Sequence, residues 1–117
     1  MSDAVLFRVM LKMRIRDGMT DEFERVWLEV GDSVTSHPAN RGQWLARSVD
    51  EPDSYYITSD WSDEPSFRQF ETSRRHVEHR QLLHPYRVGG EMTTMRVVAH
   101  VPHDNDGRTH EQWAAQG

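Results

Sequence analysis

Residues 55–67, which read Tyr-Tyr-Ile-Thr-Ser-Asp-Trp-Ser-Asp-Glu-Pro-Ser-Phe, decide the fold because they predict a strand that runs directly into a helix. The β-rich run ends on Trp61, and Ser62 stands where a helix N-cap is expected. Asp63 and Glu64 suit the first helical turn, and Pro65 suits a position early in the helix. Trp61 is therefore expected at a seam between sheet and helix, where it serves either the core or a ligand pocket.

The sequence before this junction predicts two strands and one helix. Apolar residues alternate strictly over residues 5–15, which is typical of a long strand with one buried face. Residues 20–35 carry apolar side chains at helical spacing after Thr20, a plausible N-cap. Residues 43–48 form a short strand that a turn at residues 50–53 joins to the strand at 55–61, so the two strands are expected to form a hairpin.

The sequence after the junction predicts a second helical region and a last strand. The helical region runs from Ser62 to about His84, with a kink or a break at residues 71–73, and Pro85 ends it. Residues 91–101 alternate again and predict a strand. The order β-α-β-β-α-β indicates an α+β, ferredoxin-like fold in which two helices cover one face of a four-stranded antiparallel sheet. This domain is expected to span residues 1–101, followed by a flexible polar tail at 102–117.

The other face of such a sheet would lack cover from helices. Leu6, Met10, Trp44 and one side of the strand at 91–101 place apolar surface there. Because an exposed apolar face of this kind is commonly buried against a second subunit, we expect a homodimer that forms through the open sheet face.

Composition narrows the class of protein. The chain has 117 residues, which suggests one domain, and no cysteine, which excludes disulfides and thiol chemistry. The net charge of −5 argues against a general nucleic-acid binder. There is no apolar run of membrane-spanning length and no N-terminal signal pattern, so we expect no membrane partner and a cytoplasmic protein.

Several segments together resemble the antibiotic biosynthesis monooxygenase superfamily. They are Arg16-Asp17-Gly18-Met19, Asn40-Arg41-Gly42-Gln43, Glu51-Pro52-Asp53-Ser54-Tyr55-Tyr56, Trp61-Ser62-Asp63 and the spacing of Phe67, Phe70, His76 and His79. The resemblance runs from about residue 5 to 101 and rests on order and spacing. It implies a dimeric ferredoxin-like protein, and in many members an oxidation of an aromatic polyketide phenol or anthrone to a quinone by O₂ without flavin, haem or metal.

Two branches of this superfamily can be compared with the chain. The resemblance implies that the haem-degrading branch carries an Asn, a Trp and a His at the positions that here hold Leu11, Phe70 and approximately Arg80. None of the three agrees, so haem degradation is disfavoured. The resemblance implies that the quinone-forming branch carries an Asn, a Trp and a Tyr at the positions that here hold Ile57, Trp61 and Phe67. Only Trp61 agrees. Either the reaction is kept with different groups, or the chain has become a cyclase-like or auxiliary protein.

Cofactor-free oxygenation requires removal of a proton, stabilisation of an oxyanion and exclusion of water. His76 and His79 share a helix face and are candidate bases, although a solvated helix flank is an equally simple interpretation. A metal site formed by this pair with His84 or His100 is disfavoured because no carboxylate motif accompanies it.

Aromatic and cationic side chains complete the candidate site. Trp61 is the candidate that would position substrate rings or orient them through its indole N–H. Tyr55 shares the strand face of Trp61 two pleats away and is a candidate to hydrogen-bond a phenolic oxygen. Arg80 is a candidate partner for an oxyanion. The further candidates for substrate contact are Trp27, Phe67 and Phe70, which packing in the core would equally explain.

The sequence therefore favours a cofactor-independent monooxygenase that oxidises a polycyclic aromatic polyketide with O₂ as its co-substrate. A polyketide cyclase of the same fold and a non-catalytic auxiliary or binding subunit remain the alternatives. No phosphate loop, dinucleotide fingerprint or Ser-His-Asp pattern points to another enzyme class.

Overall fold

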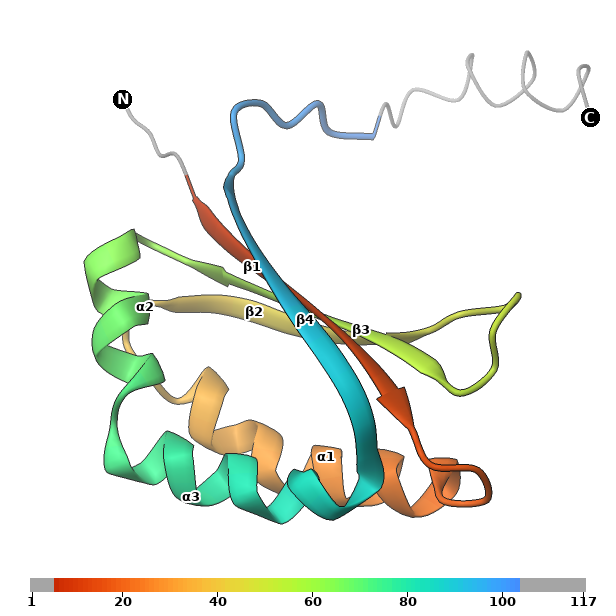
Figure 1. Cartoon of the computed structure of the whole chain (residues 1–117). Coiled ribbons are helices and arrows are strands. Elements are labelled where there is room, and N and C mark those ends of the chain that lie inside the picture. Colours follow the sequence, from red (N-terminus) through yellow and green to blue (C-terminus); the bar gives the residue numbers. More distant parts are fainter. Residues whose placement is uncertain (1–5, 104–117) are drawn as a thin grey trace, which may run out of the picture.

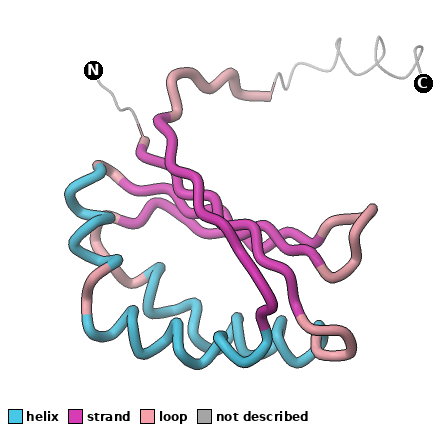
Figure 2. The backbone as a smooth tube through the Cα atoms, in the orientation of Figure 1, coloured by secondary structure: helices cyan, strands magenta, loops and turns pink. Residues whose placement is uncertain are grey.

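The computed structural model describes residues 6–103, and within them it has the predicted ferredoxin-like architecture. The elements in chain order are β1 (Phe7–Ile15), α1 (Thr20–Thr35), β2 (Asn40–Arg47), β3 (Ser54–Trp61), α2 (Glu64–Glu71), α3 (Arg74–Leu83), a short 3₁₀ turn (His84–Tyr86) and β4 (Arg87–Arg96). The strands form one antiparallel sheet in the order β2-β3-β1-β4. The helices lie together on one side of this sheet (Figures 1 and 2).

The junction after β3 differs from the prediction in its capping residue. Asp63, not Ser62, caps α2, because its Oδ1 accepts a hydrogen bond from the backbone N–H of Ser66 at 2.8 Å. The backbone N–H of Ser62 instead donates to the carbonyl of Ala39 at 2.9 Å, which keeps Ser62 beside the sheet. The backbone N–H groups at the start of α2 also lower the pKa of the Asp63 carboxyl.

Other helix boundaries were partly predicted. The interruption at residues 71–73 is a true break, after which the Ser73 side chain caps α3 by accepting from the N–H of His76. Thr20 is the first residue of α1 rather than its N-cap, and Met19 precedes it without a capping side chain. The acidic first turn of α1 is present as expected.

The strand limits follow from pairing. β4 runs over residues 87–96 instead of 91–101, because its partner β1 begins at Phe7, which pairs with Arg96. β2 starts at Asn40 instead of Gln43, because Asn40 already pairs with Trp61 at the end of β3. Most of the expected tail, residues 104–117, lies outside the described residues, as does Val5.

The core lies between the sheet and the helices and has two parts. One contains Phe7, Val9, Ala39, Trp61, Phe67 and Phe70. The other contains Met13, Ile15, Phe23, Tyr55 and Ile57. The alternation over β1 and β3 is thus confirmed, since one set of side chains from each strand points towards the helices.

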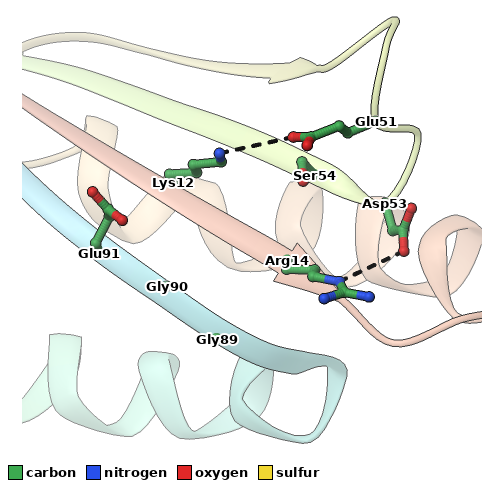
Figure 3. A pocket seen from close by; sticks show the side chains of 8 residues that line it. All are labelled: Lys12, Arg14, Glu51, Asp53, Ser54, Gly89, Gly90 and Glu91. Carbon is green, nitrogen blue, oxygen red and sulfur yellow. Dashed lines mark ion pairs between the residues drawn. The ribbon is translucent and has the colours of Figure 1, made fainter.

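The opposite face of the sheet carries both charged and apolar side chains. Arg8 donates two hydrogen bonds to Asp60, at 2.7 and 2.9 Å, and Asp60 is only 3% exposed. Lys12 pairs with Glu51 and Arg14 with Asp53, each at 3.8 Å, around a hollow of about 540 Å³ on this face (Figure 3). Trp44 is 53% exposed there. The charged lining makes this hollow unsuitable for a polycyclic aromatic ligand. None of the helices within residues 6–103 is long and apolar enough to cross a membrane.

Candidate functional site

A cavity lies between the helix-covered face of the sheet and the helices, and we call it the inner cavity. Its wide part has a volume of about 340 Å³ and is bounded by β1, β3, α2, α3 and β4. Its narrow part has a volume of about 120 Å³ and extends between α1 and α3. The two parts are adjacent, because both are lined by Leu11, Val34, Gln43, Ile57, His76, Arg80 and Arg87. A volume in this range suits a small-molecule ligand.

The inner cavity brings together most of the residues that the sequence singled out. Trp61, Phe67 and Phe70 line the wide part, and Trp27 and His79 line the narrow part. His76 and Arg80 line both parts. The site is therefore assembled from the end of β3, from both segments of the second helical region and from α1.

Trp61 is both core and cavity wall. Its side chain is 0% exposed, and its ring centroid lies 4.8 Å from that of Phe70 and 5.5 Å from that of Phe67. The indole N–H donates a hydrogen bond to Ser59 Oγ at 3.0 Å. Because that donor already has a partner, Trp61 offers the cavity an aromatic surface rather than a free N–H.

Tyr55 lies apart from the inner cavity. It is fully buried in the second part of the core, and its hydroxyl donates to Glu24 Oε2 at 2.5 Å. Burial, followed by the hydrogen bond to Glu24, raises the pKa of Tyr55 to about 12. The structure therefore gives Tyr55 a packing role and no contact with the space that a ligand would occupy.

His76 is half-buried against α2. Its ring stacks against Phe70 with centroids 4.4 Å apart, and its Nδ1 atom is buried without a hydrogen-bond partner among the described residues. Burial lowers the pKa of His76, and the nearby Arg80 guanidinium lowers it further. Because an imidazolium would bury an unpaired N–H, this environment favours the neutral form of His76.

His79 is oriented by a hydrogen bond from another helix. Its Nδ1 lies 2.5 Å from Ser33 Oγ, and the same Ser33 hydroxyl lies 2.9 Å from the carbonyl oxygen of Val30. A hydroxyl has one proton to donate. When Ser33 donates that proton to Val30, Nδ1–H of His79 must donate to Ser33, and the lone pair of the neutral ring is then on Nε2.

Sequence reasoning missed two residues of this site. Ser33 was not selected, although it lies three residues after Val30 and so interrupts the apolar face of the helix with a hydroxyl. Arg87 was not selected because its place beside the cavity depends on where β4 begins, and that strand was expected to begin at residue 91. The first omission had a readable signal in the sequence, and the second did not.

The arrangement combines an apolar chamber, two imidazoles and two guanidinium groups. Such a chamber can exclude water from a bound aromatic compound while a histidine accepts a proton and an arginine stabilises an oxyanion. Within residues 6–103, no group of three or more His, Cys, Asp or Glu side chains is placed to hold a metal ion.

Comparison with known proteins gives a family and two curated relatives. Residues 6–82 match the family model described as antibiotic biosynthesis monooxygenase. Protein SchA of Streptomyces halstedii is 29% identical over 105 residues, and the 42.8 kDa protein in the whiE locus of Streptomyces coelicolor is 28% identical over 76 residues. These matches cover 90% and 65% of this chain but only 28% and 19% of the relatives, so the chain spans about a quarter of their length or less.

Solved structures of low sequence identity share the fold. SnoaB, a cofactor-independent oxygenase from Streptomyces nogalater, superimposes with a TM-score of 0.75 at 19% identity, over 84% of this chain and 98% of that one. A conserved protein from Methanosarcina mazei Go1 gives a TM-score of 0.71 at 17% identity, over 78% of this chain and 91% of that one.

Proposed function

The chain belongs to the antibiotic biosynthesis monooxygenase family, and from this premise we propose that it is a cofactor-independent monooxygenase which oxidises a polycyclic aromatic polyketide phenol or anthrone to a quinone with O₂. The observation that carries the proposal is the inner cavity, where His76, His79 and Arg80 meet the aromatic walls formed by Trp61 and Phe70. SnoaB, which shares the fold and is a cofactor-independent oxygenase, supports the same reaction class.

We assign the proton acceptor to His79. The Ser33 hydrogen bond at Nδ1 leaves Nε2 with the lone pair, and Nε2 makes no hydrogen bond with any described residue. His76 is less suited because its buried Nδ1 disfavours the cation that a base must become. His76 instead forms part of the wall, where its neutral ring stacks on Phe70.

The chemistry then needs only the substrate and O₂. The base removes a proton from the phenol or from the anthrone methylene, and the resulting anion passes one electron to O₂. The carbon radical and superoxide combine, with uptake of one proton, to form a C–OOH group. Loss of the remaining C–H proton with cleavage of the O–O bond leaves a carbonyl and releases the second oxygen atom as water. Arg80 stabilises the anion, and the apolar walls exclude bulk water.

The experiment that tests this function compares incubations with and without oxygen. Purified, metal-free protein is mixed with an anthrone or a polyphenol, and the quinone absorbance and O₂ consumption are followed. We expect one O₂ consumed per quinone, no turnover under nitrogen, and a loss of about a hundredfold in His79→Gln. Turnover that continues unchanged under nitrogen would indicate a cyclase, and no O₂-dependent product from a broad set of phenols would contradict the oxygenase.

A non-catalytic auxiliary role is the second candidate. The observation that favours it is the presence of Ile57 and Phe67, both apolar and both lining the cavity, at the positions where the sequence comparison placed a polar Asn and Tyr. An auxiliary chain would bind the aromatic compound without changing it. His79→Gln that leaves product formation by the producing strain unchanged would favour this role over both enzymes.

The open face of the sheet supports a homodimer. Trp44 and Met10 lie on that face beside the Arg8–Asp60 pair, whose carboxylate is already almost fully buried in one subunit. Covering this face with a second copy would remove the exposed Trp44 ring from water. Light scattering should give the mass of a dimer, and Trp44→Lys should shift the mass towards a monomer; a wild-type protein that is monomeric at high concentration would contradict the proposal.

A further inference from the structure

We infer that the inner cavity has an anion-binding subsite, formed by Arg80 and Arg87, that selects aromatic ligands bearing a carboxylate. This inference deepens the proposed function, on which it rests for the aromatic class of the ligand. It adds that the ligand carries a fixed negative charge before any proton is removed. Three features of the cavity support the subsite: the position of Arg87, the lack of partners for both arginines and the charge of the lining.

The position of Arg87 is determined by Gly90. Gly90 and Arg87 pair with Met13 and Ile15 of β1, whose side chains are in the core, so both residues lie on the helix-covered face of β4. A Cβ atom built on Gly90 would lie 2.9 Å from Nη2 of Arg87. The guanidinium therefore lies over the bare backbone of Gly90 and lines the inner cavity. Because Gly90 has no side chain, the Arg87 guanidinium can occupy this position.

Arg80 reaches the same space from α3. It lines both parts of the cavity, as Arg87 does. Within residues 6–103, neither guanidinium makes an ion pair or a hydrogen bond with another residue, whereas Arg8, Arg14, Arg47, Arg68 and Arg74 all have carboxylate partners. Two guanidinium groups from separate elements are thus free to bind one ligand.

The lining of the narrow part is basic, although the protein as a whole is acidic. The whole chain has a net charge of −5, yet none of the described residues lining the narrow part is Asp or Glu. The basic side chains there are those of His76, His79, Arg80 and Arg87. Glu71 and Glu91 line only the wide part, and Glu71 is already paired with Arg68 at 3.2 Å. The narrow part therefore presents two guanidinium groups without a carboxylate among the described residues that line it.

A carboxylate is the ligand group that fits these donors. Arginine binds carboxylates through paired N–H donors in charge-assisted hydrogen bonds. Arg87 is half-buried and Arg80 is exposed, so both can meet a ligand that enters from solvent. Apart from Ser33 and Gln43, the remaining walls are apolar, including Leu11, Trp27 and Ile57, and would contact a ring system. A planar aromatic acid satisfies both halves of the lining, whereas a neutral aromatic compound would leave the two guanidinium groups without an acceptor.

The test uses a ligand that cannot be oxidised further, so that binding is measured apart from catalysis. Anthraquinone-2-carboxylate and anthraquinone-2-carboxamide have the same rings and differ in charge. Equilibrium quenching of tryptophan fluorescence gives the affinity of each. We expect the carboxylate to bind about tenfold more tightly than the carboxamide at low ionic strength, and the difference to shrink with added salt.

Four variants, one of them a control, assign that preference to residues. Arg80→Gln and Arg87→Gln should each remove most of the preference for the carboxylate. Arg75→Gln makes the same charge change at an exposed position of α3 outside the cavity lining and should leave the preference intact. Gly90→Ala keeps every charge, and its Cβ would lie 2.9 Å from Nη2 of Arg87 and 3.0 Å from the backbone carbonyl oxygen of Lys12. It should therefore displace the guanidinium and weaken carboxylate binding more than carboxamide binding, with some loss of stability. Thermal unfolding of each variant identifies any that fail to fold.

The outcomes separate this inference from the proposed function. Equal affinities for the two ligands, a preference that survives in both arginine variants, or no binding of either ligand would overturn the subsite. A carboxylate preference carried by Arg80 and Arg87 would support it even if no phenol were oxidised, and in that case the oxygenase assignment alone would fail.

Discussion

Ser33 Oγ lies 2.5 Å from His79 Nδ1, which joins α1 to α3 across the narrow part of the inner cavity. Ser33 is only 6% exposed, and its hydroxyl also lies 2.9 Å from the carbonyl oxygen of Val30. A buried hydroxyl with an acceptor on one side and an imidazole on the other can fix the ring tautomer. This makes Ser33 a positioning residue for the base that we assign.

Ser33→Ala should therefore change the tautomer of the neutral His79 ring. Without the hydroxyl, Nδ1–H loses its acceptor, and we expect the Nε2–H tautomer, which is the commoner form in water, to become populated. Nitrogen NMR shifts of the His79 ring measure the tautomer directly. Turnover should fall by about tenfold, since the lone pair no longer stays on Nε2.

Ser36→Ala is the matched control for this variant. The Ser36 hydroxyl is exposed and bonds only to the backbone carbonyl of Ser33, at 3.3 Å. It should change neither the His79 tautomer nor turnover. An Nε2–H tautomer already dominant in the wild-type protein would contradict the role of Ser33.

The lowered pKa of His76 predicts a dependence of stability on pH. An unfolded chain binds a proton at His76 near its ordinary pKa of 6.5, whereas the folded protein binds it only at a lower pH. Below about pH 6.5 the unfolded state therefore holds more protons, and the free energy of unfolding falls as the pH falls. His76→Gln should flatten this decline, as urea denaturation at pH 7.5 and 5.5 would show.

The surface histidine His84 provides the comparison for that experiment. It lies exposed in the 3₁₀ turn after α3, so His84→Gln removes an imidazole without opening the cavity. A decline with falling pH that is as steep in His76→Gln as in the wild-type protein would contradict the assignment of a neutral, buried His76.

Alternation and helical periodicity predicted β1, β3, α1 and α2 because each of them has buried residues on one side, whereas β2, β4 and α3 contain no buried residue. The side chains of β1 and β3 alternate between core and open face as the sequence indicates, and the break before Ser73 was readable from the short polar residues at 71–73. Element ends were harder to predict, because the end of β4 depends on where its antiparallel partner β1 begins, which is a tertiary constraint.

The candidate site could be predicted only in part. His76, His79 and Arg80 share a helix face, and the structure brings that face to the cavity as helical spacing suggested. Tyr55 and Trp61 also share a strand face, yet Tyr55 lies beyond the end of the cavity and only Trp61 reaches its wall. Sequence spacing gives the face of an element but not how far along that face a cavity extends.

Trp61 and Trp44 should respond differently to the same substitution. Trp61→Phe leaves a void in the core and removes the donor to Ser59 Oγ, so we expect it to destabilise the fold by about 3 kcal/mol. Trp44→Phe changes a half-exposed ring on the open face and should cost within about 0.5 kcal/mol in the isolated subunit. Chemical denaturation measures both, and equal costs would contradict the distinction between a core and a surface tryptophan.

Tyr55→Phe separates packing from ligand contact. The phenol donates to Glu24 within the core, so its removal should lower stability by about 1 kcal/mol. Because Tyr55 does not line the inner cavity, the affinity for anthraquinone-2-carboxylate should stay within about twofold of the wild-type value. Glu24→Ala removes the acceptor from the other side, together with the ion pair that Glu24 makes with Arg47 at 3.6 Å, so it should lower stability at least as much and leave the affinity equally unchanged. A large loss of ligand affinity in Tyr55→Phe with unchanged stability would instead place the phenol in contact with the ligand and require a cavity that extends past Ile57 along β3.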